Sequence, residues 1–126
     1  MKSLIIALSI GLLTIAGSIA YTNHLENVAE QMMKENEIIE QAIKNEEFEK
    51  ANKSAKELIA FVRERRVILD AVGNHQELDD IEKNLCEMTA FTQEKNKDDS
   101  IAKCRVLSFL IESLPRNFKI KIENIL

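Results

Sequence analysis

Residues 4–21 read LIIALSIGLLTIAGSIAY, 18 residues without a charged side chain, Asn, Gln or Pro. A helix of this length, at about 1.5 Å of rise per residue, is near the shortest that crosses ~30 Å of hydrocarbon. A signal peptide has a similar charged start and apolar run, and ends in small residues such as Ser18 and Ala20 here. The stretch therefore predicts a transmembrane anchor over 1–21, or a signal peptide cleaved before Tyr21.

Two observations favour the retained anchor. The apolar run is longer than the core of a signal peptide, which has about 7 to 15 residues. No Pro or Gly breaks the helical pattern between Ser18 and Asn45, whereas cleavage requires an extended segment. Because Lys2 precedes the run and acidic residues follow it, the positive-inside rule places the N-terminus in the cytoplasm and residues 22–126 outside.

The rest of the chain has the composition of a small helical domain. Of the 126 residues, 30% are charged and 5% aromatic, with three Gly, one Pro and no Trp. Such a mixture favours helices over sheets. The formal net charge is −4, so we expect no nucleic-acid partner. Composition thus predicts a single all-α domain after the anchor.

Apolar residues in this domain recur at three- and four-residue spacing, in four successive segments. The stripes consist of Leu25, Val28, Met32, Ile39 and Ala42; Phe48, Ala51, Ala55, Leu58, Val62, Leu69 and Val72; Leu78, Ile81, Leu85, Met88 and Phe91; and Ile101, Cys104, Leu107, Leu110, Ile111 and Leu114. Four amphipathic helices joined by short turns predict an antiparallel helical bundle. The anchor is expected to continue as its first helix, to about Lys44.

Capping residues predict where the helices begin and end. We expect Asn45 to cap the second helix, Gly73 to end it, Asn74 to cap the third, Asp98 or Asp99 to cap the fourth, and Pro115 to end the fourth.

After Pro115 the apolar period changes. Phe118, Ile120 and Ile122 alternate with charged residues, which is the pattern of an extended segment with one buried face. The pattern predicts a short extended C-terminal tail that lies along the bundle, or else a short fifth helix.

Two segments carry a resemblance to a known family. Residues 61–85, FVRERRVILDAVGNHQELDDIEKNL, and the closing ENIL with Asn124 resemble an uncharacterised (domain of unknown function) family. Its members are short, N-terminally membrane-anchored helical proteins of spore-forming Gram-positive bacteria. The family has no established activity, and its genes often lie near those of multi-spanning membrane proteins. The resemblance therefore implies a membrane-associated protein partner.

His75 and Asp79 are the first candidates for a chemical site. Their spacing of four residues on a helix would suit two metal ligands. The chain lacks the second His or the Cys cluster that zinc sites usually have, so we expect Asp79 to act as a first-turn acid or as a hydrogen-bond partner of His75. Phosphate-binding loops and nucleophile motifs are also missing from the sequence, and we predict no catalytic residue, metal or cofactor.

Arg63, Arg65 and Arg66 form the densest basic cluster. Arg65 interrupts the apolar stripe of its helix, as Glu35 does in the first helix. We expect Arg65 to pair with a carboxylate, Glu35 being the candidate, and Arg63 and Arg66 to be solvated.

Cys86 and Cys104 each lie nine residues from Lys95, in the predicted turn between the third and fourth helices. A helical hairpin would bring them level and close together. A disulfide is allowed outside the cytoplasm, but a free Cys is also a common small core residue. Both alternatives remain open from the sequence.

These observations predict a non-enzymatic interaction or accessory module, anchored in the membrane and outside the cytoplasm. Its expected partners are membrane lipid, through the N-terminal helix, and a multi-spanning membrane protein. The alternative is a ligand-sensing helical bundle at the cell surface, which would need a pocket with converging polar groups between the helices.

Overall fold

The computed structural model describes residues 1–71 and 75–125. Within these residues it contains no strand and the helices α1 (Lys2–Lys44), α2 (Phe48–Asp70), α3 (His75–Gln93) and α4 (Lys97–Ile125). The prediction of an all-α chain is confirmed. The expected roles of Val72, Gly73 and Asn74, and the place of Leu126, lie outside the described residues.

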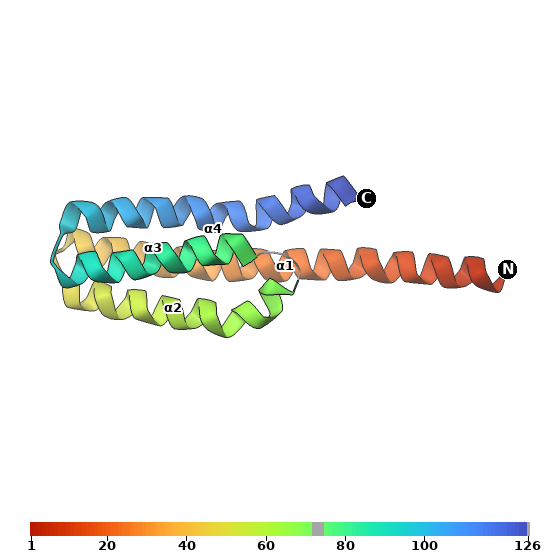
Figure 1. The fold of residues 1–126 in the computed structure, drawn as a ribbon, viewed down its shortest axis with the longest axis horizontal. Helices are drawn as coiled ribbons and strands as arrows, with labels where there is room; N and C mark the ends of the chain where they lie inside the picture. Colours follow the sequence, from red (N-terminus) through yellow and green to blue (C-terminus); the bar gives the residue numbers. More distant parts are fainter. Residues whose placement is uncertain (72–74, 126) are drawn as a thin grey trace.

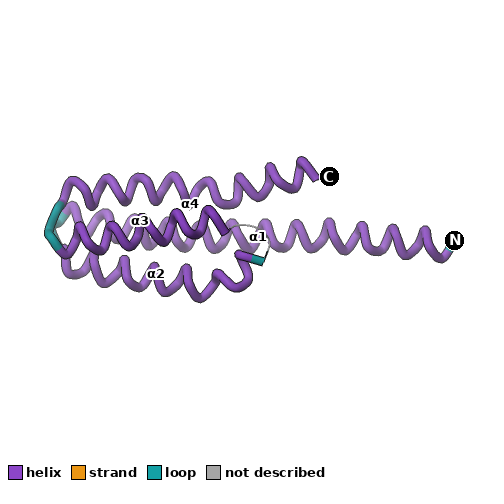
Figure 2. The backbone as a smooth tube through the Cα atoms, viewed as in Figure 1, coloured by secondary structure: helices purple, strands orange, loops and turns teal. Residues whose placement is uncertain are grey.

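The four helices contact one another in a ring. α1 packs against α2 and α4, and α3 packs against the same two helices. α2 runs back along α1 and α4 runs back along α3, and the N-terminal part of α1 extends beyond the other helices (Figure 1; Figure 2). Leu25 is the first buried residue of the chain, so only the second half of α1 belongs to the helical domain.

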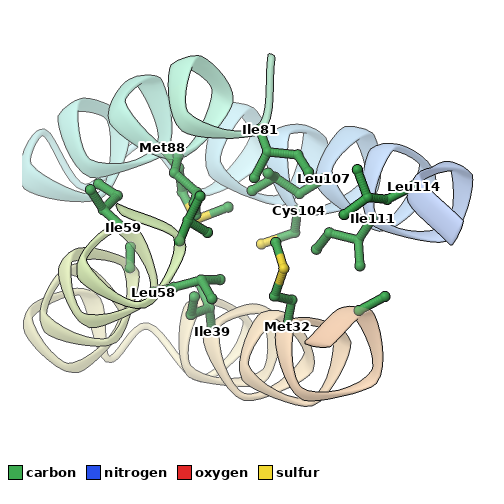
Figure 3. Packing of buried hydrophobic residues seen from close by; sticks show 14 of the residues in the cluster. Met32, Ile39, Leu58, Ile59, Ile81, Met88, Cys104, Leu107, Ile111 and Leu114 are labelled. Carbon is green, nitrogen blue, oxygen red and sulfur yellow. The ribbon is translucent and has the colours of Figure 1, made fainter. Parts of the chain in front are cut away.

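The core is built from the apolar stripes predicted by the helical period. Leu25, Leu58, Leu85 and Leu107, one from each helix, are at most 1% exposed. Figure 3 shows side chains from all four helices meeting between the backbones. Helical propensity alone does not hold helices of this length in place, so burial of these stripes provides most of the stability.

The turns after α1 and α3 have the same construction. Glu46 and Lys95 adopt positive φ angles of 60° and 59°, and the next residue donates back to Ala42 O and Phe91 O at 2.8 and 2.9 Å respectively. These are Schellman motifs, which usually carry Gly at the left-handed position.

Two predicted caps are therefore wrong. Asn45 closes α1 and does not begin α2, because its N–H donates to Gln41 O. Asn96, and neither Asp98 nor Asp99, caps α4: its Oδ1 accepts from the Asp99 N–H at 3.2 Å, and its Nδ2 donates to the Asp99 carboxylate at 2.7 Å. The cap lies two residues before Asp98, directly after the left-handed Lys95 of the Schellman turn.

The predicted extended tail is also wrong, because α4 continues through Pro115 to Ile125. Proline removes one backbone hydrogen bond and costs about 3 kcal/mol inside a helix, and α4 bends over its last turns (Figure 1). Leu114 and Phe118 are 0% and 6% exposed, and burial of such side chains contributes about 1.5–3 kcal/mol each. Their packing offsets the cost of the proline.

The helical period changes which tail residues are buried. Phe118 lies against Tyr21 of α1, with ring centroids 4.6 Å apart, and Ile122 is half-buried four residues on. Ile120, which the alternating pattern placed on the same face, is 49% exposed.

A pair of substitutions distinguishes the helical tail from an extended one. We expect Phe118→Ala to lower the free energy of unfolding by about 3 kcal/mol, and Ile120→Ala to change it by less than about 0.5 kcal/mol. Thermal unfolding of the full chain in mild detergent measures both. Equal losses from the two variants would contradict the helical assignment.

Candidate functional site

Arg66 is the centre of an ion-pair cluster where α2 approaches α3. Its guanidinium donates to Asp79 at 2.6 Å, to Glu82 at 3.1 Å and to Asp70 at 3.2 Å. His75 Nδ1 lies 3.3 Å from the same guanidinium. The Arg66 side chain is only 17% exposed. This Arg66 cluster joins the last turn of α2 to the first turns of α3 on either side of residues 72–74.

Charge pairing dominates the electrostatics of the Arg66 cluster. The hydrogen bond from Arg66 holds the pKa of the Asp79 carboxyl below its usual range, and the same bond is the main cause that raises the pKa of Arg66. His75 stands between two carboxylates, with its Nδ1 3.5 Å from Asp70 and its Nε2 3.6 Å from Asp79. Every ionised group in the cluster thus has an opposite charge nearby, an arrangement suited to holding two helices together.

The structure corrects the partner predicted for Arg65 and the solvation predicted for Arg66. Arg65 lies over the Phe61 ring, with its guanidinium carbon 3.5 Å from the centroid, and pairs with Glu64 at 3.5 Å; no ion pair joins it to Glu35 among the described contacts. Arg66, expected to be solvated, takes the carboxylates because it lies one turn after Val62, on the side of α2 that meets α3.

Of the other predicted polar positions, His75 and Asp79 belong to the Arg66 cluster and Asn124 does not. His75 begins α3, as expected, and Asp79 lies beside it. Asn124 is exposed on the last turn of α4, far along the chain from any residue of the Arg66 cluster. Across the described residues, no group of three or more His, Cys, Asp or Glu side chains is placed to hold a metal ion.

Asn36 is a buried polar position that the sequence analysis missed. It is 2% exposed, and its amide donates to the Cys104 carbonyl at 2.8 Å and to Ser108 Oγ at 2.9 Å. Its own oxygen is buried without a hydrogen-bond partner. The sequence spacing does predict its burial. Asn36 follows Met32 by four residues and precedes Ile39 by three, so it lies on the buried stripe of α1. The bond ties α1 to α4 at one register.

The two cysteines are free thiols in the structure. Lys103 of α4 pairs with Glu87 of α3 and donates to Asn84 at 3.3 Å, so the turns that carry the cysteines lie at the same level. Cys86 is exposed, whereas Cys104 is buried and its side chain is directed toward Met32 of α1 (Figure 3). Burial raises the pKa of the Cys104 thiol to about 12. The two thiols thus lie on neighbouring turns in different surroundings, one at the surface and one in the core.

The N-terminal half of α1 carries most of the exposed large apolar side chains of the described residues. Its long apolar window is entirely unburied, and by length and composition it is the one candidate membrane span among the described residues. Leu4, Leu8, Leu12 and Ile19 are between 58% and 68% exposed. A signal sequence near the N-terminus meets the same criteria of length and composition, so these features alone support a membrane-associated or signal segment.

Comparison with known proteins extends the description of the chain. A family model described as "Domain of unknown function (DUF4363)" matches residues 19–125. The matched region therefore covers the helical domain and leaves out most of the exposed apolar segment. Neither a curated protein nor a solved structure matches the chain.

The Arg66 cluster predicts a difference between neighbouring arginines. We expect Arg66→Gln to lower the free energy of unfolding by about 2 kcal/mol at neutral pH, because hydrogen bonds between charged groups contribute about 1.5–3 kcal/mol. Arg63→Gln is the matched control: Arg63 also contacts Glu82, at 3.4 Å, but its side chain is 62% exposed. Its loss is expected to stay within about 0.5 kcal/mol.

The pH dependence of the same experiment tests whether Arg66 acts through ionised carboxylates. Because the pKa of Asp79 is lowered in the folded chain, its contribution is present above the ordinary pKa of about 3.9 and is lost as the pH falls through the lowered value. The difference between wild type and Arg66→Gln in urea unfolding should therefore shrink below about pH 4. A difference that is constant with pH would show that Arg66 acts through packing.

Proposed function

The chain belongs to the DUF4363 family of domains of unknown function, and we propose that it is a single-pass membrane protein with an accessory domain outside the cytoplasm. In this proposal residues 1–21 are a retained anchor, and residues 22–126 form an antiparallel helical bundle that acts without catalysis. The bundle would support another membrane protein, a multi-spanning one, which it meets through its anchor.

The unbroken α1 helix is the observation that carries the proposal. It runs from Lys2 to Lys44, so the helix does not stop between Ser18 and Tyr21, where a signal peptidase would need an extended chain. A cleavable signal segment would be expected to be separated from the helical domain by a break in the helix before the first buried residue. Here the exposed apolar segment and the buried stripe belong to one rigid element.

Polar groups within the apolar segment support a membrane environment. Thr14 Oγ1 donates to Ile10 O at 2.8 Å, Ser18 Oγ to Thr14 O at 2.9 Å, and Thr22 Oγ1 to Ser18 O at 2.8 Å. Each of these three hydroxyls is therefore satisfied inside the helix, as hydrocarbon surroundings favour. Lys2 before the segment and acidic residues after it favour a cytoplasmic N-terminus.

Two further observations support a protein partner in the membrane. A Cβ atom added at Gly11 or Gly17 would meet nothing within 4 Å, so both positions are open to close approach by another helix. Arg66 pairs with Glu82 and Asp79 across α2 and α3, which favours a structural role for this polar site of the bundle.

A single mass measurement tests anchor and orientation together. Intact cells of a host without an outer membrane, producing the full chain, are treated under mild reduction with a membrane-impermeant maleimide. We expect the protein in the membrane fraction to have the mass of the full chain, including Met1 to Tyr21, plus one label on the exposed Cys86. Cys104 should remain unlabelled because it is buried.

The Cys86→Ser variant is the control and should gain no label. A mature chain that begins at Tyr21 would overturn the anchor and make the segment a signal peptide. Labelling only after the cells are opened would overturn the external position of the bundle.

A further inference from the structure

The last turns of α4 lie beside the apolar segment of α1. One groove between them is lined by Leu13, Gly17 and Tyr21 of α1 with Phe118 and Ile122 of α4. A second groove is lined by Ile15, Ser18, Ile19 and Thr22 with Lys119 and Ile122. Ile122 and Ser18 border both grooves, so Ile122 sits on the ridge between them. The end of α4 thus contacts residues that belong to the predicted membrane span.

The register of α1 and α4 gives the extent of this overlap. Asn36 bonds to Cys104, and Tyr21 contacts Phe118, so the two helices advance together in opposite directions along the chain. α4 continues beyond Phe118 to Ile125, which adds about 10 Å at ~1.5 Å per residue. Its end therefore reaches past Tyr21 toward Thr14, into the level of the apolar segment.

The exposed side chains of these turns suit the boundary of a bilayer. Ile120 is 49% exposed, and Lys119 and Lys121 flank it in the sequence. Their ammonium groups pair with Glu26 at 2.5 Å and Glu77 at 3.4 Å. Apolar side chains beside lysines, whose long stems carry the charge toward water, are typical of helix ends at a membrane surface.

We propose that phospholipid of the outer leaflet covers the end of α4, so that the bundle contacts the membrane at a second place besides its anchor. This inference rests on the proposed anchor. The polar layer on each side of the hydrocarbon is about 5–8 Å thick. Because α4 runs toward the membrane, an overlap of about 10 Å carries its last turns past this layer to the upper ends of the acyl chains, with Glu123 and Asn124, which are exposed, deeper than Ile120.

Continuity is the argument for lipid over another occupant. The grooves beside Ile122 open directly onto the exposed apolar surface of α1, from Leu13 to Ile19. The medium that surrounds that surface, water or lipid, therefore also contacts the end of α4. Lipid around the anchor therefore extends onto α4 without any additional partner.

Tryptophan fluorescence can test this directly, because the chain contains no Trp. Three single substitutions are made in the full chain: Ile120→Trp at the end of α4, Phe109→Trp on the same helix and 63% exposed, and Leu8→Trp in the anchor and 60% exposed. Each protein is reconstituted in phosphatidylcholine vesicles, with and without bromine on the upper part of the acyl chains. Bromine quenches only a tryptophan that is in contact with it.

We expect Leu8→Trp and Ile120→Trp to lose emission in the brominated vesicles and to emit at shorter wavelength than Phe109→Trp, which should be unaffected. Phe109 lies 11 residues before Ile120, or about 16 Å farther from the membrane. Asn124→Trp, one turn beyond Ile120, repeats the test at an exposed position that carries no packing, and should also be quenched.

The outcomes separate this inference from the proposed anchor. Quenching of Leu8→Trp without quenching of Ile120→Trp or Asn124→Trp would overturn the lipid contact and leave the anchor in place. A blue-shifted but unquenched Ile120→Trp would mean that protein, a second copy or a partner, covers α4, which also overturns it. If Leu8→Trp itself is unquenched, the anchor is wrong.

Discussion

The structure depends on one constraint, the continuity of α1 from an exposed apolar segment into a buried stripe. Residues before Leu25 are exposed or, like Tyr21, only partly buried, and those from Leu25 to Ile43 supply one wall of the core. A helix without Pro or Gly between Ser18 and Lys44 has no site for a kink. Any orientation that a membrane imposes on the first half is therefore transmitted to the whole helical domain.

Two polar contacts fix the register of the helices that the apolar stripes bring together. Hydrophobic stripes alone allow neighbouring helices to slide by a turn, because many registers bury similar area. Asn36 sets the position of α4 against α1 through Cys104 O, and Arg66 sets α3 against α2 through Asp79 and Glu82. Buried polar groups that select one register at some cost in stability have this role in other helical assemblies.

The sequence predicted the elements governed by local rules and missed those decided by packing. Helical spacing was sufficient for the four stripes and for the end of α1 at Lys44. The prediction from helical spacing failed after Pro115. Proline disfavours the interior of a helix by about 3 kcal/mol, and the burial of Leu114 and Phe118 offsets this cost. The sequence analysis also assigned the buried ion pair to Arg65 and not to Arg66. A charged residue that interrupts an apolar stripe does not indicate which side of its helix faces the next helix.

Hydrogen exchange across the junction of anchor and domain tests the central claim most directly. The full chain is placed in a phosphatidylcholine bilayer, and amide exchange is followed from Ala16 to Val28. We expect protection without a gap, with the amides of Tyr21 to His24 exchanging as slowly as those of the first buried turn at Leu25. Rapid exchange confined to Tyr21–His24, with protection on either side, would reveal a hinge and contradict the account.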